Sequence, residues 1–349
     1  MFLRALSISY LYIHTLFDMK LRIGILDSKE FTVMPRYVQV AGFVVVICAL
    51  TYALLRLLTP APHPAPRNDT GHPHSQPAPS SRMLYGLTID DSWDDTKALS
   101  DIVEALQRLP ARPTVRIVMS NDRSPQSYHE LFKAIHRVAD IMAQPVDSSS
   151  MQRYSVERYQ QRFAESYHHL SQYVTIWEIG NEINGQEWIK ENPRLTAAKV
   201  ASAYRYIRDK HGLTALVPYY FPPGESTLSM RDWLRTYLPD DLKQGLDYVL
   251  VSYYEDDNDG YQPNWRQVFT ELEALFSRAK LGIGECGTPS EHAPMARKLQ
   301  LFQHYYSMPQ YTPRYVGGYF WWYWAHDGVP YRDNPLWEET SKYMKKRER

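Results

Sequence analysis

The chain has 349 residues, with 39 basic and 39 acidic side chains and therefore a formal net charge of +0. This balance gives no reason to expect a nucleic-acid partner, because such binding depends on an excess of positive charge. The length suits one α/β barrel of about 250 residues together with shorter flanking segments. The two cysteines, Cys48 and Cys286, stand in unrelated contexts, so no disulfide is predicted.

An apolar run at residues 38–58 is the first segment with a clear meaning, because it is long enough to span a bilayer as a helix. Basic residues precede it. Residues 1–37 are therefore expected to be cytoplasmic, and the remainder of the chain to lie on the periplasmic or extracellular side. A cleaved signal peptide is the alternative interpretation of the run. Met34 is an alternative start, which would shorten the cytoplasmic segment.

Residues 59–81 follow the apolar run and contain seven prolines. Such a composition is typical of a stiff, extended spacer and not of a packed core. The expected organisation is a cytoplasmic segment (1–37), a transmembrane signal anchor (38–58), a Pro-rich linker (59–81) and one folded domain (82–349).

The folded domain alternates short apolar segments with longer amphipathic ones. The expected strands cover residues 83–89, 114–119, 140–144, 174–182, 214–219, 248–253, 281–285 and 315–322. The expected helices cover residues 93–109, 155–173, 195–210, 230–243, 265–279 and 293–306, with two more that begin at Ser124-Pro125 and near residue 335. This alternation predicts an α/β fold, a single (β/α)8 barrel. A doubly wound open sheet is the alternative, but no Gly-rich phosphate turn follows the first strand.

Two of the expected strands end at a glutamate. The fourth runs through Trp-Glu-Ile-Gly into Asn181-Glu182, and the seventh, Leu-Gly-Ile-Gly, stops at Glu285. The carboxyl ends of all strands of a parallel barrel open onto one face, where active sites lie. Cleavage of a glycosidic bond with retention needs two carboxyl groups, one to attack the anomeric carbon and one to protonate the leaving oxygen. Either glutamate alone could be a solvated loop residue, but the pair on strands four and seven favours catalysis.

This order of motifs resembles clan A of the glycoside hydrolases, the retaining barrel enzymes that include families 5 and 39. The resemblance covers residues 83–340 and implies that Glu182 is the acid/base and Glu285 the nucleophile. It further implies that Asn181 contacts the sugar 2-hydroxyl. Arg116, on strand two, would lie beside the nucleophile and keep it ionised. An ion pair between Arg116 and Glu178 inside the barrel is the alternative for this arginine.

The resemblance also implies an aromatic subsite at the strand ends. A tyrosine after strand six would donate a hydrogen bond to the nucleophile, and Tyr253 is preferred for this role over Tyr254. Trp321, Trp322 and Trp324 end strand eight, and one of them is expected to form the floor of the subsite, with Trp93 and Asp90 as candidates for further sugar contacts. Other residues expected on this face are Asp91, Asn121, Asp147, Trp188 and His326. No spaced set of metal ligands is visible in the sequence, so neither a metal nor a cofactor is expected.

The sequence therefore predicts a membrane-tethered, retaining glycoside hydrolase that acts on a β-linked poly- or oligosaccharide, with a suggested link to exopolysaccharide metabolism. A catalytically silent, glycan-binding barrel in a polysaccharide export machine is the alternative. A metal-dependent polysaccharide deacetylase is disfavoured because its ligands are not visible.

Overall fold

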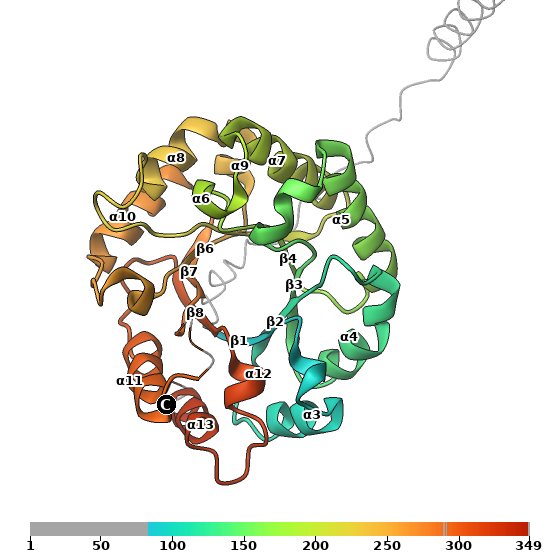
Figure 1. Cartoon of the computed structure of the whole chain (residues 1–349), viewed down its shortest axis with the longest axis vertical. Coiled ribbons are helices and arrows are strands. Elements are labelled where there is room, and N and C mark those ends of the chain that lie inside the picture. The colour runs from blue at the N-terminus through green and yellow to red at the C-terminus, as the bar shows by residue number, and fades with distance from the viewer. Residues whose placement is uncertain (1–82, 289, 291, 348–349) are drawn as a thin grey trace, which may run out of the picture. The chain divides into compact units, whose positions relative to one another are not determined.

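The computed structural model describes residues 83–288, 290 and 292–347. Within them, eight parallel strands form a closed barrel in the order β1 to β8, and β8 pairs with β1. Figure 1 looks into this barrel, with the strands at the centre and the helices in a ring around them. The predicted (β/α)8 barrel is confirmed, and the open sheet is excluded because its two edge strands pair with each other.

The strands differ from their predicted bounds by at most two residues at either end, and β3 has the bounds that were predicted. They are β1 (Leu84–Ile89), β2 (Thr114–Val118), β3 (Asp140–Gln144), β4 (Ile176–Asn181), β5 (Leu213–Val217), β6 (Tyr248–Ser252), β7 (Lys280–Glu285) and β8 (Tyr315–Trp321). Because all of them are parallel, their carboxyl ends lie on one face of the barrel.

The outer ring consists of α-helices, with short 3-10 helices in several of the loops. The α-helices are α3 (Leu99–Gln107), α4 (His129–His136), α5 (Val156–Leu170), α6 (Gln186–Ile189), α7 (Pro193–Asp209), α8 (Met230–Tyr237), α9 (Asp240–Gly245), α10 (Trp265–Leu275), α11 (Met295–Tyr306), α12 (Trp324–Asp327) and α13 (Pro335–Arg347). The 3-10 helices are η2 (Trp93–Asp95), η3 (Pro125–Tyr128), η4 (Ser148–Arg153) and η5 (Glu255–Asn258).

Two predicted helices are divided in the structure. The helix expected at 93–109 forms only η2 and then α3, because Asp and Thr, which occupy residues 94–96, are poor helix formers and favour turns. The helix expected at 230–243 separates into α8 and α9 at Pro239, which lacks an N–H group and clashes with the preceding turn.

Buried apolar side chains form two clusters. The larger one lies between the strands and the surrounding helices, and the smaller one fills the interior of the barrel. Interior members come from alternate positions of several strands and include Met142, Val217, Leu250 and Phe320. Gly86 makes room for the ring of Phe320, because a Cβ atom at this position would lie 2.6 Å from that ring.

The proposed N-terminal organisation cannot be followed in the structure. The predicted cytoplasmic segment (1–37), transmembrane anchor (38–58) and linker (59–81) lie outside the described residues, as does Cys48. Of the helices that the structure describes, none combines the length and the apolar character needed to cross a bilayer. Cys286 is a buried, free cysteine.

Candidate active site

The carboxyl ends of the strands bring the two predicted catalytic glutamates to one cavity. Asn181 is the last residue of β4, Glu182 follows it, and Glu285 is the last residue of β7. These three residues line a cavity of about 400 Å³ together with Tyr254 and Trp322. The remaining walls are formed by Asp147, Ser148, Ser149, Trp188, Tyr219, Asp257 and Tyr323. A cavity of this size on this face is where barrel enzymes carry their active sites.

Arg116, on β2, lies beneath the cavity and is wholly buried. Its Nη1 donates to Oε2 of Glu285 at 2.5 Å, and its Nε and Nη2 donate to the two carboxylate oxygens of Glu178 at 2.6 and 2.7 Å. Arg116 therefore forms both of the interactions considered from the sequence, the contact with Glu285 and the ion pair with Glu178. Burial raises the pKa of Glu178 to about 6, although the charge and hydrogen bonds of Arg116 act in the opposite direction.

Glu285 receives hydrogen bonds from three side chains. Besides Arg116, the hydroxyl of Tyr254 donates to Oε1 at 2.6 Å, and Nδ2 of Asn181 donates to Oε2 at 3.4 Å. Asn181 is itself oriented by the backbone N–H of Ser148, which donates to Oδ1 at 3.2 Å. These donors fix the orientation of the Glu285 carboxylate and stabilise its negative charge, as attack on a carbon centre requires.

Tyr254, and not the preferred Tyr253, is the tyrosine that contacts this carboxylate. The hydroxyl of Tyr253 donates instead to the carbonyl oxygen of Tyr261 at 2.7 Å, and its ring belongs to the outer apolar cluster. Strand parity explains the difference, because Tyr248 of β6 faces the interior and Tyr254 shares its parity. Burial, and then the negative charge of Glu285, raise the pKa of Tyr254, so its phenol remains a donor.

Glu182 has different surroundings from Glu285. It adopts a positive φ of 43°, and its carboxyl oxygens accept hydrogen bonds from Oγ of Ser252 at 2.7 Å and from Oγ of Ser148 at 3.5 Å. Its burial disfavours the charged form, and the negative charge of Glu285 adds repulsion. Together they raise the pKa of Glu182 well above its usual range. Glu182 therefore holds a proton where an ordinary glutamate is ionised.

The two carboxyl groups of the cavity thus have different hydrogen-bond donors. Glu285 is held by a guanidinium, a phenol and an amide, whereas Glu182 meets only hydroxyl donors among the described side chains. Two carboxyl groups whose environments differ in this way can divide the tasks of nucleophile and proton donor. Among the residues that the structure describes, no group of His, Cys, Asp or Glu side chains is arranged to hold a metal ion.

The predicted tryptophans lie in different places. Trp322 lines the cavity, with the Cζ atom of Arg116 at 5.6 Å from its ring centroid. Trp324 does not face the cavity: it is wholly buried, and its Nε1 donates to Oγ1 of Thr340 at 3.4 Å. The extended chain ends at Trp321, and α12 then turns the Trp324 side chain toward α13, so strand parity no longer predicts its direction.

Asp90 and Trp93 are not among the residues that line the cavity. The carboxylate of Asp90 is buried and forms an ion pair with His326, with Oδ1 and Nε2 3.0 Å apart. Burial raises the pKa of Asp90, but hydrogen bonds from His326 and Ser92 outweigh it, so the net shift is downward. Trp93 lies in η2 and packs partly buried against the outer apolar cluster. Neither residue therefore forms part of the cavity wall in this structure.

Several residues of the cavity were not predicted. Tyr219 lines the cavity, and Ser252 lies behind it as a donor to Glu182. Both lie near the ends of the expected fifth and sixth strands, so their position was the available signal. Ser148, Asp257 and Tyr323 lie in loops or short 3-10 turns, where no periodic pattern indicates direction. Trp188, one of the further residues expected on this face, lines the cavity.

The tyrosine pair provides a test of this geometry. In Tyr254→Phe, Glu285 loses a charge-assisted hydrogen bond, which contributes about 1.5–3 kcal/mol. If Glu285 is the nucleophile, kcat/KM should fall about 10- to 100-fold. Tyr253→Phe is the matched control, because it removes a hydroxyl bonded only to a backbone carbonyl. This control should lower the thermal unfolding midpoint slightly and leave kcat/KM within about twofold. Equal losses of activity in the two variants would contradict the assignment.

No protein-family model matches this chain, and no curated protein matches it. Solved structures do. A variant of Saccharomyces cerevisiae Gas2p in complex with laminaritetraose and laminaripentaose superimposes with a TM-score of 0.50 at 14% identity, covering 76% of this chain and 64% of that one. A glucosidase from Croceicoccus marinus gives a TM-score of 0.49 at 14% identity, with coverages of 71% and 61%.

A family 1 β-glucosidase from Thermotoga maritima gives a TM-score of 0.43 at 13% identity, with coverages of 66% and 77%. The chain thus spans less than two thirds of the Gas2p and Croceicoccus chains. At such identities the likeness concerns the fold alone. That fold is the closed, parallel eight-stranded barrel that the alternation of strands and helices predicts.

Proposed function

We propose that the protein is a retaining glycoside hydrolase that cleaves O-glycosidic bonds of a β-linked poly- or oligosaccharide by double displacement. The observation that carries the proposal is the pair Glu182 and Glu285, which share one cavity at the carboxyl ends of β4 and β7 in contrasting environments. The fold shared with Gas2p, which was crystallised with laminari-oligosaccharides, supports it.

In the first step, a carboxylate oxygen of Glu285 attacks the anomeric carbon of the sugar. The bond from that carbon to the leaving oxygen breaks while Glu182 transfers its proton to this oxygen, leaving a glycosyl ester on Glu285. In the second step, Glu182 takes a proton from water, and the water oxygen displaces Glu285 from the anomeric carbon. Each carboxyl group thereby returns to its starting state.

The neighbouring residues have defined tasks in this scheme. Arg116 and Tyr254 hold Glu285 from below and from the side, so that its oxygens are presented to the cavity. Asn181 adjoins the same carboxylate and is placed to contact the sugar 2-hydroxyl, a hydrogen bond that strengthens in the transition state. The rings of Trp188 and Trp322 supply aromatic walls, which suit the apolar face of a pyranose ring.

A β-linked glycan is the proposed substrate class. Gas2p, whose fold is similar, was crystallised with laminari-oligosaccharides. We extend such a substrate to this chain because its cavity combines carboxyl groups with aromatic walls. Hydrolysis of a panel of β-glycans would separate this proposal from the alternative of a silent, glycan-binding barrel. The silent barrel would bind a glycan without producing reducing ends, and a pair of carboxyl groups that share one cavity in different surroundings argues against it.

The stereochemical outcome tests the mechanism directly. We expect the first product to keep the anomeric configuration of the substrate, because double displacement inverts that centre twice. Retention also requires the two carboxyl groups to lie about 5–5.5 Å apart, whereas inverting enzymes separate them by about 6.5–9.5 Å. Proton NMR of the product within the first minutes, before mutarotation, distinguishes the two. An inverted first product would remove the assignment of Glu285 as nucleophile.

We further propose that residues 38–58 anchor the barrel to a membrane, with the Pro-rich linker 59–81 holding it on the periplasmic or extracellular side. Support comes from the length of the apolar run and the basic residues before it. A membrane-bound glycosidase would suit a polysaccharide that the same cell exports.

Fractionation tests the anchor. The full chain is expected to sediment with membranes and to resist extraction with carbonate, because a spanning helix is released only by detergent. The fragment that begins at residue 82 is the control and should remain soluble and folded. If expression of the full-length gene gives a soluble protein whose N-terminus lies beyond residue 58, the apolar run is a cleaved signal peptide instead.

A further inference from the structure

A second pocket lies beside the candidate active site, between the loop that follows β5 and helix α10. It has a volume of about 430 Å³, within the range of small-molecule binding sites. Phe221 lines this pocket, and its ring packs against those of Tyr219 and Trp188 at centroid distances of 4.8 and 5.8 Å. Because Tyr219 and Trp188 line the active-site cavity, this aromatic group forms a wall shared by the two sites.

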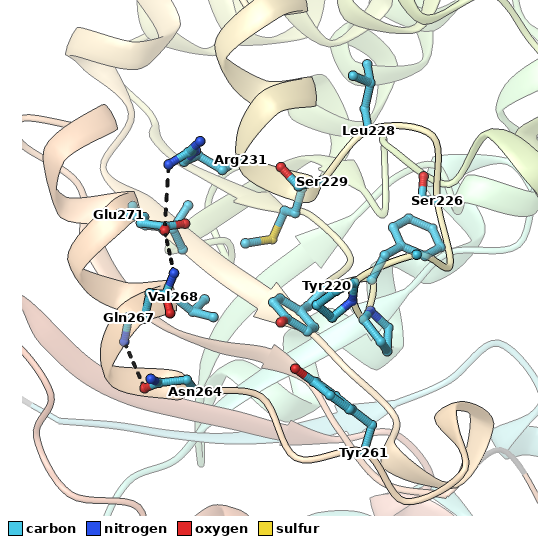
Figure 2. Close-up of a pocket in the computed structure, with 16 residues that line it drawn as sticks. Tyr220, Ser226, Leu228, Ser229, Arg231, Tyr261, Asn264, Gln267, Val268 and Glu271 are labelled. Carbon is cyan, nitrogen blue, oxygen red and sulfur yellow. Dashed lines mark hydrogen bonds and ion pairs between the residues drawn. The ribbon is translucent and has the colours of Figure 1, made fainter.

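One side of the pocket is aromatic. Figure 2 shows Tyr220 and Tyr261 side by side, with their hydroxyl groups directed into the same space. Tyr261 is 39% exposed, which makes it the one aromatic residue among the large hydrophobic residues that the described part of the chain leaves exposed. An exposed tyrosine ring at the mouth of a pocket offers an apolar face together with a polar edge.

The opposite side of the pocket is polar and comes mainly from one helix. Asn264, Gln267 and Glu271 follow one face of α10 and its N-terminal cap, at helical spacing. The Nε2 of Gln267 donates to Oε1 of Glu271 at 3.0 Å, and Nη1 of Arg231 approaches the same oxygen at 3.6 Å (Figure 2). The amide, carboxylate and guanidinium groups in this row are each planar, and each keeps donor or acceptor capacity for a ligand.

We propose that this pocket binds sugar units of the same glycan chain at a distance from the bond that is cleaved. The inference rests on the proposed function for its substrate class and extends it, because it assigns a second carbohydrate-binding site. A pyranose presents one apolar face and a rim of hydroxyl groups. The pocket presents a tyrosine face on one side and paired planar polar groups on the other.

The chemistry of the pocket disfavours other small ligands. A phosphate-bearing ligand would need unpaired positive charge, but the single guanidinium in the lining, that of Arg231, faces Glu271. A purely apolar ligand would leave Gln267 and Glu271 without hydrogen-bond partners for their remaining atoms. A neutral, polyhydroxylated ligand satisfies both sides of the pocket.

The expected consequence is a preference for long chains. A short substrate reaches only the cavity of Glu182 and Glu285, whereas a longer one can also engage the pocket. The additional binding should raise kcat/KM for polymers and leave that for a short activated aryl β-glycoside unchanged. A site of this kind also lowers the dissociation constant of oligosaccharides once they are long enough to reach it.

The test uses the full chain with Tyr261→Ala and, separately, Gln267→Ala. Both side chains are exposed, and the Tyr261 backbone carbonyl that accepts from Tyr253 is retained, so the fold should persist. Leu195→Ala is the matched control, because Leu195 is 40% exposed on α7 and does not line the pocket. Two readouts are compared: kcat/KM on a short aryl β-glycoside and on polymeric β-glucan, and calorimetric titration with laminari- and cello-oligosaccharides from the disaccharide to the hexasaccharide.

The proposal expects Tyr261→Ala and Gln267→Ala to lower kcat/KM on the polymer, and affinity for the longer oligosaccharides, by about tenfold. Neither variant should change hydrolysis of the aryl glycoside, and Leu195→Ala should change nothing. Unchanged polymer hydrolysis and oligosaccharide affinity in both pocket variants, with an active parent, would overturn the pocket and leave the proposed function intact. A parent that binds oligosaccharides through Tyr261 but hydrolyses none would support the pocket and contradict the proposed function. Neither binding nor hydrolysis in the parent would overturn both.

Discussion

Glu285→Gln should reduce kcat/KM by a factor between about 10⁴ and 10⁶, the loss seen when the nucleophile of a covalent mechanism is removed. An amide of the same shape cannot form the glycosyl ester, so the route through double displacement closes. The measurement is hydrolysis of an activated aryl β-glycoside under conditions of substrate excess. A loss of less than about tenfold would exclude Glu285 as the nucleophile.

The fold should survive this change. Arg116 keeps both hydrogen bonds to Glu178, so its buried charge remains paired after Glu285 becomes neutral. Glu191→Gln is a matched control, because Glu191 is a mostly buried carboxylate that pairs with Lys199 and does not line the cavity. The control should affect the thermal unfolding midpoint and spare activity, whereas Glu285→Gln should do the reverse.

The positions of the catalytic candidates could be predicted because they depend on strand ends. A strand that stops at Asn181-Glu182 and another that stops at Glu285 must open onto the same face once the barrel is parallel. The order of the strands is sufficient for this prediction, and the direction of no other side chain is needed. Both glutamates and Asn181 do line one cavity.

Side-chain direction was harder to predict when both faces of a strand are buried. Every residue of β6 is buried, so its sequence does not show whether Tyr253 or Tyr254 faces the interior. The structure resolves this through Tyr248 and Ser252, which point inward and share the parity of Tyr254. Trp324 was misplaced for a different reason, because it follows a turn into α12 where the alternation of a strand no longer applies.

Glu182→Ala should separate the two steps of the reaction. Protonation of the leaving oxygen contributes about 10² to 10⁴ to the rate, so substrates with poor leaving groups should lose about this much. An activated aryl glycoside needs little protonation, and its first step should survive. The second step lacks its general base, so the glycosyl ester on Glu285 should accumulate and produce a burst of the aryl alcohol. Rapid-mixing absorbance measurements detect this burst.

The pH dependence follows from the same carboxyl group. Burial and the charge of Glu285 raise the pKa of Glu182, and the protonated form is the one that donates. In the unmodified protein, kcat/KM should therefore be retained below that raised pKa and fall as pH rises through it. This loss of kcat/KM at high pH should be absent when Glu182→Ala acts on the activated glycoside. Because the two carboxyl groups interact, the apparent pKa of the pH profile belongs to the pair and not to Glu182 alone.

Azide decides which glutamate has which role. It attacks the anomeric carbon without general-base help, so it should release the accumulated ester of Glu182→Ala as a glycosyl azide of retained configuration. Glu285→Ala forms no ester and should give neither the burst nor this product. The opposite pattern would reverse the roles: Glu285→Ala would give the burst and the retained azide, and Glu182→Ala would give only an azide of inverted configuration, because azide would enter the space left by the missing nucleophile and attack the substrate once. An azide of inverted configuration from Glu285→Ala would instead support the assignment, because azide then replaces the Glu285 carboxylate in a single displacement. Ser252 donates to Glu182, whereas Arg116 donates to Glu285. We therefore expect the retained azide from Glu182→Ala, because a guanidinium orients the Glu285 carboxylate for attack and no cation among the described residues does so for Glu182.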